Sequence, residues 1–186
     1  MKIMKTSSRN FIESVLSYGM IAGMLIIIVR AAVYLFDIDQ TNVSFSFVNF
    51  AYNIVVLAAC LYIGTVTYRK RTTTGNLTYG KGLLTGITIS FVTITLIYVY
   101  DLIFHFFIAP DYLADIIETQ LAPIVNNPSI PPAQKLDIIG KIEKYSSPFY
   151  NTSMNALVSF GISVIIALIT AIFTVRKRPV IIEETN

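Results

Sequence analysis

Four long runs of hydrophobic residues divide the chain, and polar segments separate them. The runs occupy residues 11–36, 47–68, 83–109 and 152–175. Each is long enough to cross the hydrocarbon core of a bilayer, which takes a helix of about 20 residues. The pattern predicts an all-α polytopic membrane protein in which residues 1–186 form one membrane domain, a four-transmembrane-helix bundle.

The segment 110–150, between the third and fourth runs, has hydrophobic residues at regular intervals instead of one continuous hydrophobic run. Hydrophobic residues recur at helical spacing in 113–124 and again in 136–142, and the sequence NNPSIPP separates the two stretches. This pattern is typical of short amphipathic helices that lie on a membrane surface. We therefore expect two short amphipathic helices in this loop.

The basic residues predict the orientation. They gather before the first run, between the second and third runs and after the fourth run, whereas the other two loops are acidic. Because Lys and Arg in short loops mark the cytoplasmic side, we expect both termini in the cytoplasm and segment 110–150 outside. The basic inner loop could also contact anionic lipid or a partner. Its residues are Arg69, Lys70, Arg71 and Lys81.

Composition agrees with a membrane protein: 54% of residues are hydrophobic and 13% are charged. A soluble domain would need more charge. The net charge of +3 follows from the topology, so we expect the lipid bilayer and no nucleic acid as a partner.

Small residues predict how the helices pack. Gly19 and Gly23 have the GxxxG spacing that lets two helices approach closely, and Gly64 and Gly86 lie on the polar or small faces of their runs. These glycines could serve contacts within the bundle. A homodimer through Gly19 and Gly23 stays open as the alternative.

Three side chains that can carry charge lie well inside the runs: Arg30, Asp101 and His105. At 1.5 Å per residue, Arg30 lies about 9 Å and Asp101 about 12 Å from the outer ends of their runs. A charge in the membrane is expensive, so such residues are usually paired or reached by water. They could line an outward-facing polar cavity, in which Asp101 orients His105 or His105 relays a proton. The alternative is an Arg30–Asp101 ion pair that fixes helix packing.

Other polar residues extend this candidate site. Asn53 and Asn155 could add hydrogen-bonding groups to the cavity or join helices to one another. A polar stripe on the fourth run favours helix packing over a conduction path. The stripe consists of Thr152, Asn155, Ser159, Ser163, Thr170 and Thr174.

Catalytic motifs are scarce. The chain has one histidine and one cysteine, Cys60, and it has no GxSxG sequence. We therefore expect no enzyme, no cofactor and no metal site. An intramembrane enzyme with His105 and Asp101 as acid–base groups is the weakest alternative.

The sequences SYGMIAGM (17–24) and GNLTYGKGLLTGITIS (75–90), followed by the long outer loop, resemble the bacterial membrane family known as domain of unknown function 4199. The resemblance implies a four-span inner-membrane protein of unassigned activity. It also implies gene neighbours that include a polyprenyl-phosphate glycosyltransferase, so a partner of that type is an expectation.

Two functions remain from the sequence. The first is a non-catalytic partner or accessory subunit of cell-envelope machinery, linked to polyprenyl-phosphate sugar handling. The second is a small transporter or flippase subunit that uses the cavity around Arg30, Asp101 and His105.

Overall fold

The computed structural model describes residues 2–38, 42–71, 77–144 and 147–175. These residues form six α-helices and one π-helical turn and contain no strand, so the predicted all-α fold is confirmed. The elements are α1 (Lys2–Leu35), α2 (Val43–Arg71), α3 (Tyr79–Ile103), η1 (Phe104–Ile108), α4 (Tyr112–Val125), α5 (Pro132–Lys144) and α6 (Pro148–Thr174).

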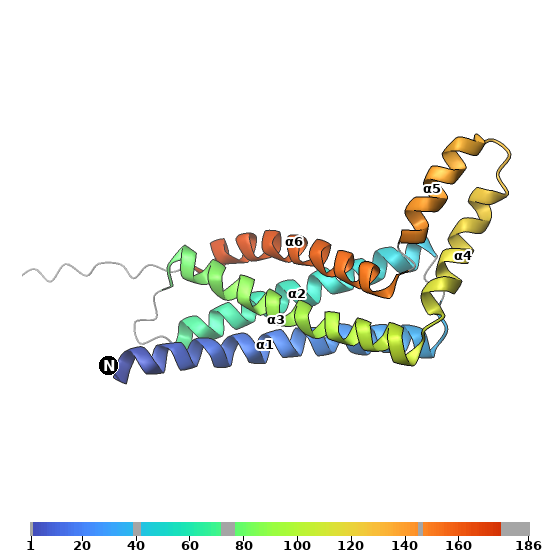
Figure 1. Ribbon diagram of the computed structural model, residues 1–186. Helices are drawn as coiled ribbons and strands as arrows, with labels where there is room; N and C mark the ends of the chain where they lie inside the picture. The colour runs from blue at the N-terminus through green and yellow to red at the C-terminus, as the bar shows by residue number, and fades with distance from the viewer. Residues whose placement is uncertain (1, 39–41, 72–76, 145–146, 176–186) are drawn as a thin grey trace, which may run out of the picture.

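Four helices are long and apolar enough to cross a membrane: α1, α2, α3 with η1, and α6. They lie side by side as a bundle, and the short helices α4 and α5 form a hairpin that extends sideways from one end of it (Figure 1). We call this end the hairpin end, and the opposite end, where α1 begins and α6 finishes, the termini end. The chain is thus a multi-pass membrane protein with two short helices between its third and fourth spans.

The helices extend beyond the hydrophobic runs that predicted them. The helix α1 begins at Lys2 rather than near residue 11, and α6 begins at Pro148 rather than near residue 152. Hydropathy marks the part of a helix that contacts lipid, whereas the backbone hydrogen bonds continue into polar sequence. Proline is well suited to the first turn of a helix because it has no N–H to satisfy there, which explains the start of α6.

The third span also differs from the uniform helix expected to Ala109. Its last turn is the π-helix η1, in which the Ala109 N–H donates to the Phe104 carbonyl at 2.8 Å. Pro110 follows at once and cannot continue the backbone ladder. The wider turn therefore ends the span and redirects the chain into the hairpin.

The glycines of α1 face α3. A Cβ atom on Gly19 would lie 2.7 Å from the Cβ of Val92, and one on Gly23 would lie 2.8 Å from Leu96 Cδ2. The close approach lets the Thr93 hydroxyl donate to the Gly19 carbonyl across the two helices at 3.1 Å. These two glycines therefore form the contact between α1 and α3 within one chain.

The other two glycines singled out from the sequence also sit at helix contacts. A Cβ on Gly64 of α2 would meet Ile89 Cδ1 of α3 at 2.6 Å, and one on Gly86 of α3 would meet Ala167 Cβ of α6 at 3.0 Å. The helix α3 thus lies against all three other spans, and the buried core forms around Leu61 and Ile89, which are fully buried.

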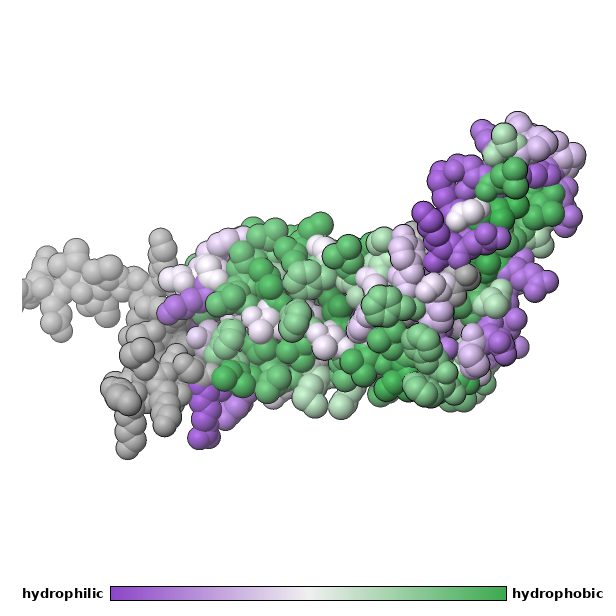
Figure 2. All heavy atoms as spheres, in the orientation of Figure 1, coloured by the Kyte–Doolittle hydropathy of each residue, from purple (hydrophilic) through white to green (hydrophobic). Residues whose placement is uncertain are grey.

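The outer surface of the bundle is hydrophobic. Figure 2 shows hydrophobic residues covering the visible face of the four spans, with hydrophilic residues on the hairpin and near the termini end. Large apolar side chains such as Phe91 of α3 and Ile172 of α6 are exposed on this surface. Lipid is the solvent that such a surface requires.

Candidate functional site

An ion pair joins the first and third spans. The Arg30 Nη1 of α1 donates to Asp101 Oδ1 of α3 at 2.6 Å and also contacts Asp101 Oδ2. The Arg30 side chain is 36% exposed and that of Asp101 is 13% exposed. Because a lone charge inside a membrane is unfavourable, each residue stabilises the charge of the other.

Two cavities meet at this pair. The central cavity, of about 280 Å³, lies between the four spans, and the hairpin-side cavity, of about 360 Å³, lies between the spans and α4. Both have the same residues in their common wall: Arg30, Asn49, Asp101, Asn155 and Ser159. The ion pair therefore lies between two spaces of different chemistry.

The central cavity is mainly apolar. Its hydrophobic lining comes from every span and includes Ile26, Ile54, Leu57, Ile97, Ile162 and Ile166. Its polar lining includes Asn53 and Tyr98, whose hydroxyl is 3.3 Å from the Ser153 hydroxyl. A largely apolar space with a few polar groups is typical of small-molecule sites.

Aromatic rings line the hairpin-side cavity and attach the hairpin to the bundle. The Tyr112 ring of α4 stacks on the His105 ring with centroids 6.3 Å apart. It also meets the Phe104 ring edge-on at 5.4 Å and the Tyr34 ring of α1 at 5.8 Å. Such ring pairs each contribute about 0.5–1.5 kcal/mol beyond the area that they bury.

His105 lies in this cavity but is not hydrogen-bonded to Asp101 among the described residues. Both carboxylate oxygens of Asp101 contact Arg30, and His105 lies in the π-helical turn, where its ring packs on Tyr112 instead. The expectation that Asp101 orients His105 is therefore not met in this structure. The His105 Nδ1 is buried and has no hydrogen-bond partner in the described chain.

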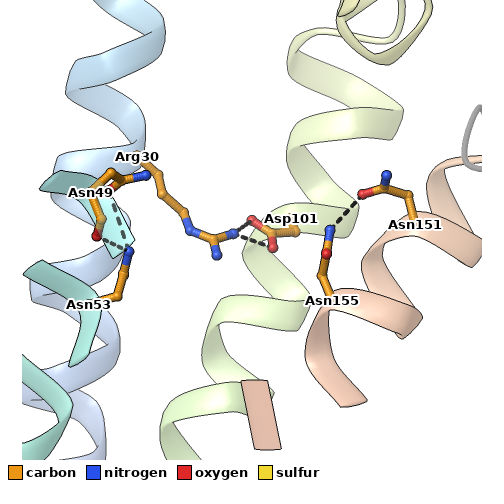
Figure 3. Close-up of polar contacts among 6 residues, drawn as sticks. All are labelled: Arg30, Asn49, Asn53, Asp101, Asn151 and Asn155. Carbon is orange, nitrogen blue, oxygen red and sulfur yellow. Dashed lines mark hydrogen bonds and ion pairs between the residues drawn. The ribbon is translucent and has the colours of Figure 1, made fainter. Parts of the chain in front are cut away.

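Two pairs of asparagines extend the polar layer to the remaining spans (Figure 3). Asn53 of α2 donates to the Asn49 carbonyl at 2.7 Å, and Asn155 of α6 donates to Asn151 Oδ1 at 2.8 Å. Each pair lies on a single helix, so neither asparagine joins two helices through these bonds. Asn53 lines the central cavity and Asn155 lines both cavities.

The polar stripe of α6 divides into two parts. Toward the termini end, the hydroxyls of Ser163, Thr170 and Thr174 donate to carbonyls of their own helix, and these residues are buried. Toward the hairpin end, Asn155 and Ser159 line the cavities. Because half of the stripe is packed and satisfied by its own backbone, it does not form a continuous polar path in this structure.

The residues of the basic inner loop divide between helix contacts and the surface. Arg69 Nη1 donates to the Thr174 carbonyl at the end of α6 at 2.8 Å, and Arg71 Nη1 lies 3.5 Å from Glu13 Oε2. Lys70 and Lys81 are exposed. The expected basic groups before Arg9 and after Val175 lie outside the residues whose side chains are described.

Sequence reasoning missed three contributors to the site, and it placed a fourth, Ser159, only on the packing stripe of the fourth run. Asn49 and Ser159 line both cavities, Asn151 binds Asn155, and Tyr112 packs on His105. The four-residue spacing of Asn49 from Asn53 and of Asn151 from Asn155 was the available signal, because residues four apart share a helix face.

No group of three or more His, Cys, Asp or Glu side chains in the described residues is arranged to hold a metal ion. Comparison with curated proteins and with solved structures found no match. Residues 17–176 match the family described as a protein of unknown function (DUF4199). This range includes most of the first span, the other three spans, the hairpin and all residues that line both cavities. The chain therefore belongs to that family.

Proposed function

We propose that this chain is a non-catalytic transport protein, a small transporter or flippase subunit of a bacterial inner membrane. In this proposal the hairpin end faces outward and both termini lie in the cytoplasm, as the positions of Lys and Arg indicate. The ligand binds between the four spans and leaves or enters at the hairpin end.

The observation that carries the proposal is the position of the Arg30–Asp101 pair in the common wall of two cavities. An ion pair that served only to hold the helices together would not need a cavity on either side of it. Ionisable residues that face a cavity inside a membrane usually mark the path of a substrate or ion. The asparagines on α2 and α6 supply further hydrogen-bonding groups at the same place.

A lipid-scrambling assay tests the proposal. The full chain is reconstituted in vesicles that contain a fluorescent short-chain phosphatidylglycerol, and dithionite measures how fast the label crosses the bilayer. We expect faster crossing than in protein-free vesicles, and a loss of this gain in Asp101→Asn. Glu13→Gln is the matched control because it removes one carboxylate at the termini end, far from both cavities.

A second variant keeps the test informative if Asp101→Asn does not accumulate. Ala156→Leu adds bulk to the wall of the central cavity without changing charge. Loss of crossing in this variant supports transport through the cavity. Equal crossing rates in the wild type, Ala156→Leu and protein-free vesicles would rule out transport of this lipid.

A second candidate function is an accessory subunit of cell-envelope machinery, a binding partner of an enzyme that handles polyprenyl-linked sugars. The hairpin extends away from the bundle, and Lys70 and Lys81 are exposed at the termini end, so both ends offer surface for a partner (Figure 1). Purification of the tagged chain from native membranes in mild detergent tests this candidate. A stoichiometric protein that remains bound supports it, and an isolated chain contradicts it.

A further inference from the structure

We propose that the two cavities together form one binding site for an anionic amphiphile with a single hydrocarbon chain. The anionic headgroup, a phosphate monoester or a carboxylate, binds the free edge of the Arg30 guanidinium, and the chain enters the central cavity. This inference rests on the proposed function, because it names the class of ligand for the same site.

The unused hydrogen-bonding capacity at the ion pair belongs to the cation. Only Nη1 of Arg30 contacts Asp101, and its Nε and Nη2 groups have no hydrogen-bond partner among the described residues. A guanidinium has five N–H donors, and its planar edge suits two oxygens of a phosphate or carboxylate. Asp101, in contrast, is the less exposed partner, and both of its oxygens contact Arg30. The pair can therefore accept a second anion more readily than a second cation.

Further donors lie near this edge of Arg30. Asn49 and Asn155 share the common wall of the cavities with Arg30, and an asparagine amide has two N–H groups. Figure 3 shows Arg30 extending between the asparagines of α2 and α6 toward Asp101. A headgroup at this point would meet donors from several spans at once.

The central cavity suits a hydrocarbon chain. Its volume of about 280 Å³ corresponds to about nine groups of ~30 Å³, the size of a water molecule or a similar small group. The lining residues that are exposed are Ser46, Phe50, Asn155 and Ser159, and all of them lie on α2 or α6. The cavity therefore opens between these two helices, on the side of the bundle where the chain of a lipid could enter from the bilayer.

Binding to the full chain in phosphatidylcholine nanodiscs tests the inference. The probes are decyl phosphate and decanoate, with decyltrimethylammonium as the cation of equal chain length and inorganic phosphate as the headgroup alone. Native mass spectrometry counts bound probe, and titration gives Kd. We expect one tight site for at least one decyl anion and weak binding of the cation and of inorganic phosphate. Comparison of the two anions distinguishes a phosphate lipid from a fatty acid.

Two substitutions give opposite effects if the inference is right. Arg30→Gln removes the guanidinium, so we expect it to abolish saturable anion binding. Asp101→Asn removes the carboxylate that competes for the positive charge, so we expect it to tighten anion binding about tenfold, as for a hydrogen bond to a charged group. Glu13→Gln changes net charge by the same amount at a distant place, and we expect it to leave Kd unchanged.

A third variant keeps both charged residues and tests whether the hydrocarbon chain of the ligand occupies the central cavity. Ala156→Leu narrows the central cavity, so we expect it to weaken decyl phosphate binding while leaving Asp101 and Arg30 in place. Equal binding of the decyl cation and anion would overturn the headgroup assignment, and so would a tight site retained in Arg30→Gln. Equal binding of inorganic phosphate and decyl phosphate would overturn the assignment of the central cavity to a hydrocarbon chain.

The outcome is separable from that of the transport proposal. Selective anion binding without lipid crossing in vesicles would retain this inference and contradict transport of phosphatidylglycerol. Lipid crossing without any selectivity for anionic probes would retain transport and overturn this inference.

Discussion

Arg30 and Asp101 are 71 positions apart in the sequence, and their side chains form an ion pair between α1 and α3. The close approach of these helices at Gly19 and Gly23 makes that pair possible, because it holds the two spans together along their length. The sequence placed both residues at a similar depth on oppositely directed helices. The structure adds that their contact lies beside two cavities.

The two members of the pair should differ in their effect on stability. Arg30→Gln leaves the 13%-exposed Asp101 without its counter-charge, whereas Asp101→Asn leaves the 36%-exposed Arg30, which reaches solvent more easily. We expect both to lower the free energy of unfolding, by about 1–3 kcal/mol, with the larger loss in Arg30→Gln. Thermal unfolding in one detergent measures this order. The reverse order would mean that the exposed fractions do not decide the cost.

The glycines at the α1–α3 contact should respond differently to alanine. In Gly19→Ala the new Cβ meets the branched Cβ of Val92, which cannot move without its backbone, whereas in Gly23→Ala it meets the movable end of Leu96. We therefore expect Gly19→Ala to lower the unfolding free energy by about 1–3 kcal/mol and Gly23→Ala to lower it less. Gly161→Ala is the control, because nothing lies within 4 Å of its new Cβ. An equal effect at Gly19 and Gly161 would contradict a close contact in the membrane protein.

The Tyr112 ring should control how firmly the hairpin is held. Its contacts with His105, Phe104 and Tyr34 are the aromatic link between α4 and the bundle. Tyr112→Ala should increase hydrogen exchange throughout α4 and α5 while the spans keep their protection. Tyr112→Phe retains the ring and should change exchange much less. If Tyr112→Ala leaves exchange in the hairpin unaltered, other contacts hold it.

Single-cysteine variants should test both whether the cavities are accessible and which way the protein faces in the membrane. In a Cys60→Ala background, Ser159→Cys should react with a membrane-impermeant maleimide, because Ser159 also lines the hairpin-side cavity, which faces outward in the proposed topology. Ser163→Cys, one helical turn along α6, should not react, because Ser163 is fully buried. Labelling of intact cells tests which way the protein faces. Reaction of Ser159→Cys only after the cells are opened would reverse the proposed topology.

Much of the fold was predictable because lipid imposes a simple rule on sequence. A span must be a long apolar helix with its backbone satisfied internally, so the runs that include Arg30, Asn53, Asp101 and Asn155 could be found from hydropathy alone. The two hairpin helices followed from a helical repeat interrupted by NNPSIPP. The ends of helices were less accurate, because polar residues can continue a helix beyond the apolar run.

The site was less predictable, because its details depend on how helices turn against one another. The sequence suggested that Asp101 orients His105, but it could not reveal the π-helical turn that begins at Phe104. Nor could it show that the Asp101 oxygens are taken by Arg30. The role of Tyr112 depends on the docking of a separate hairpin, which no local pattern contains.

The hairpin connects α3 to α6 along the chain and extends sideways from the bundle. Movement of the hairpin would therefore be transmitted to the two spans that carry part of the site. The helix α4 has 14 residues and so extends about 21 Å from its base. Asp101 and Asn155 lie on the two spans that the hairpin connects. A protein that bound the tip of the hairpin and moved it would also rotate the ends of these two spans. A small rotation there would move the opposite walls of both cavities.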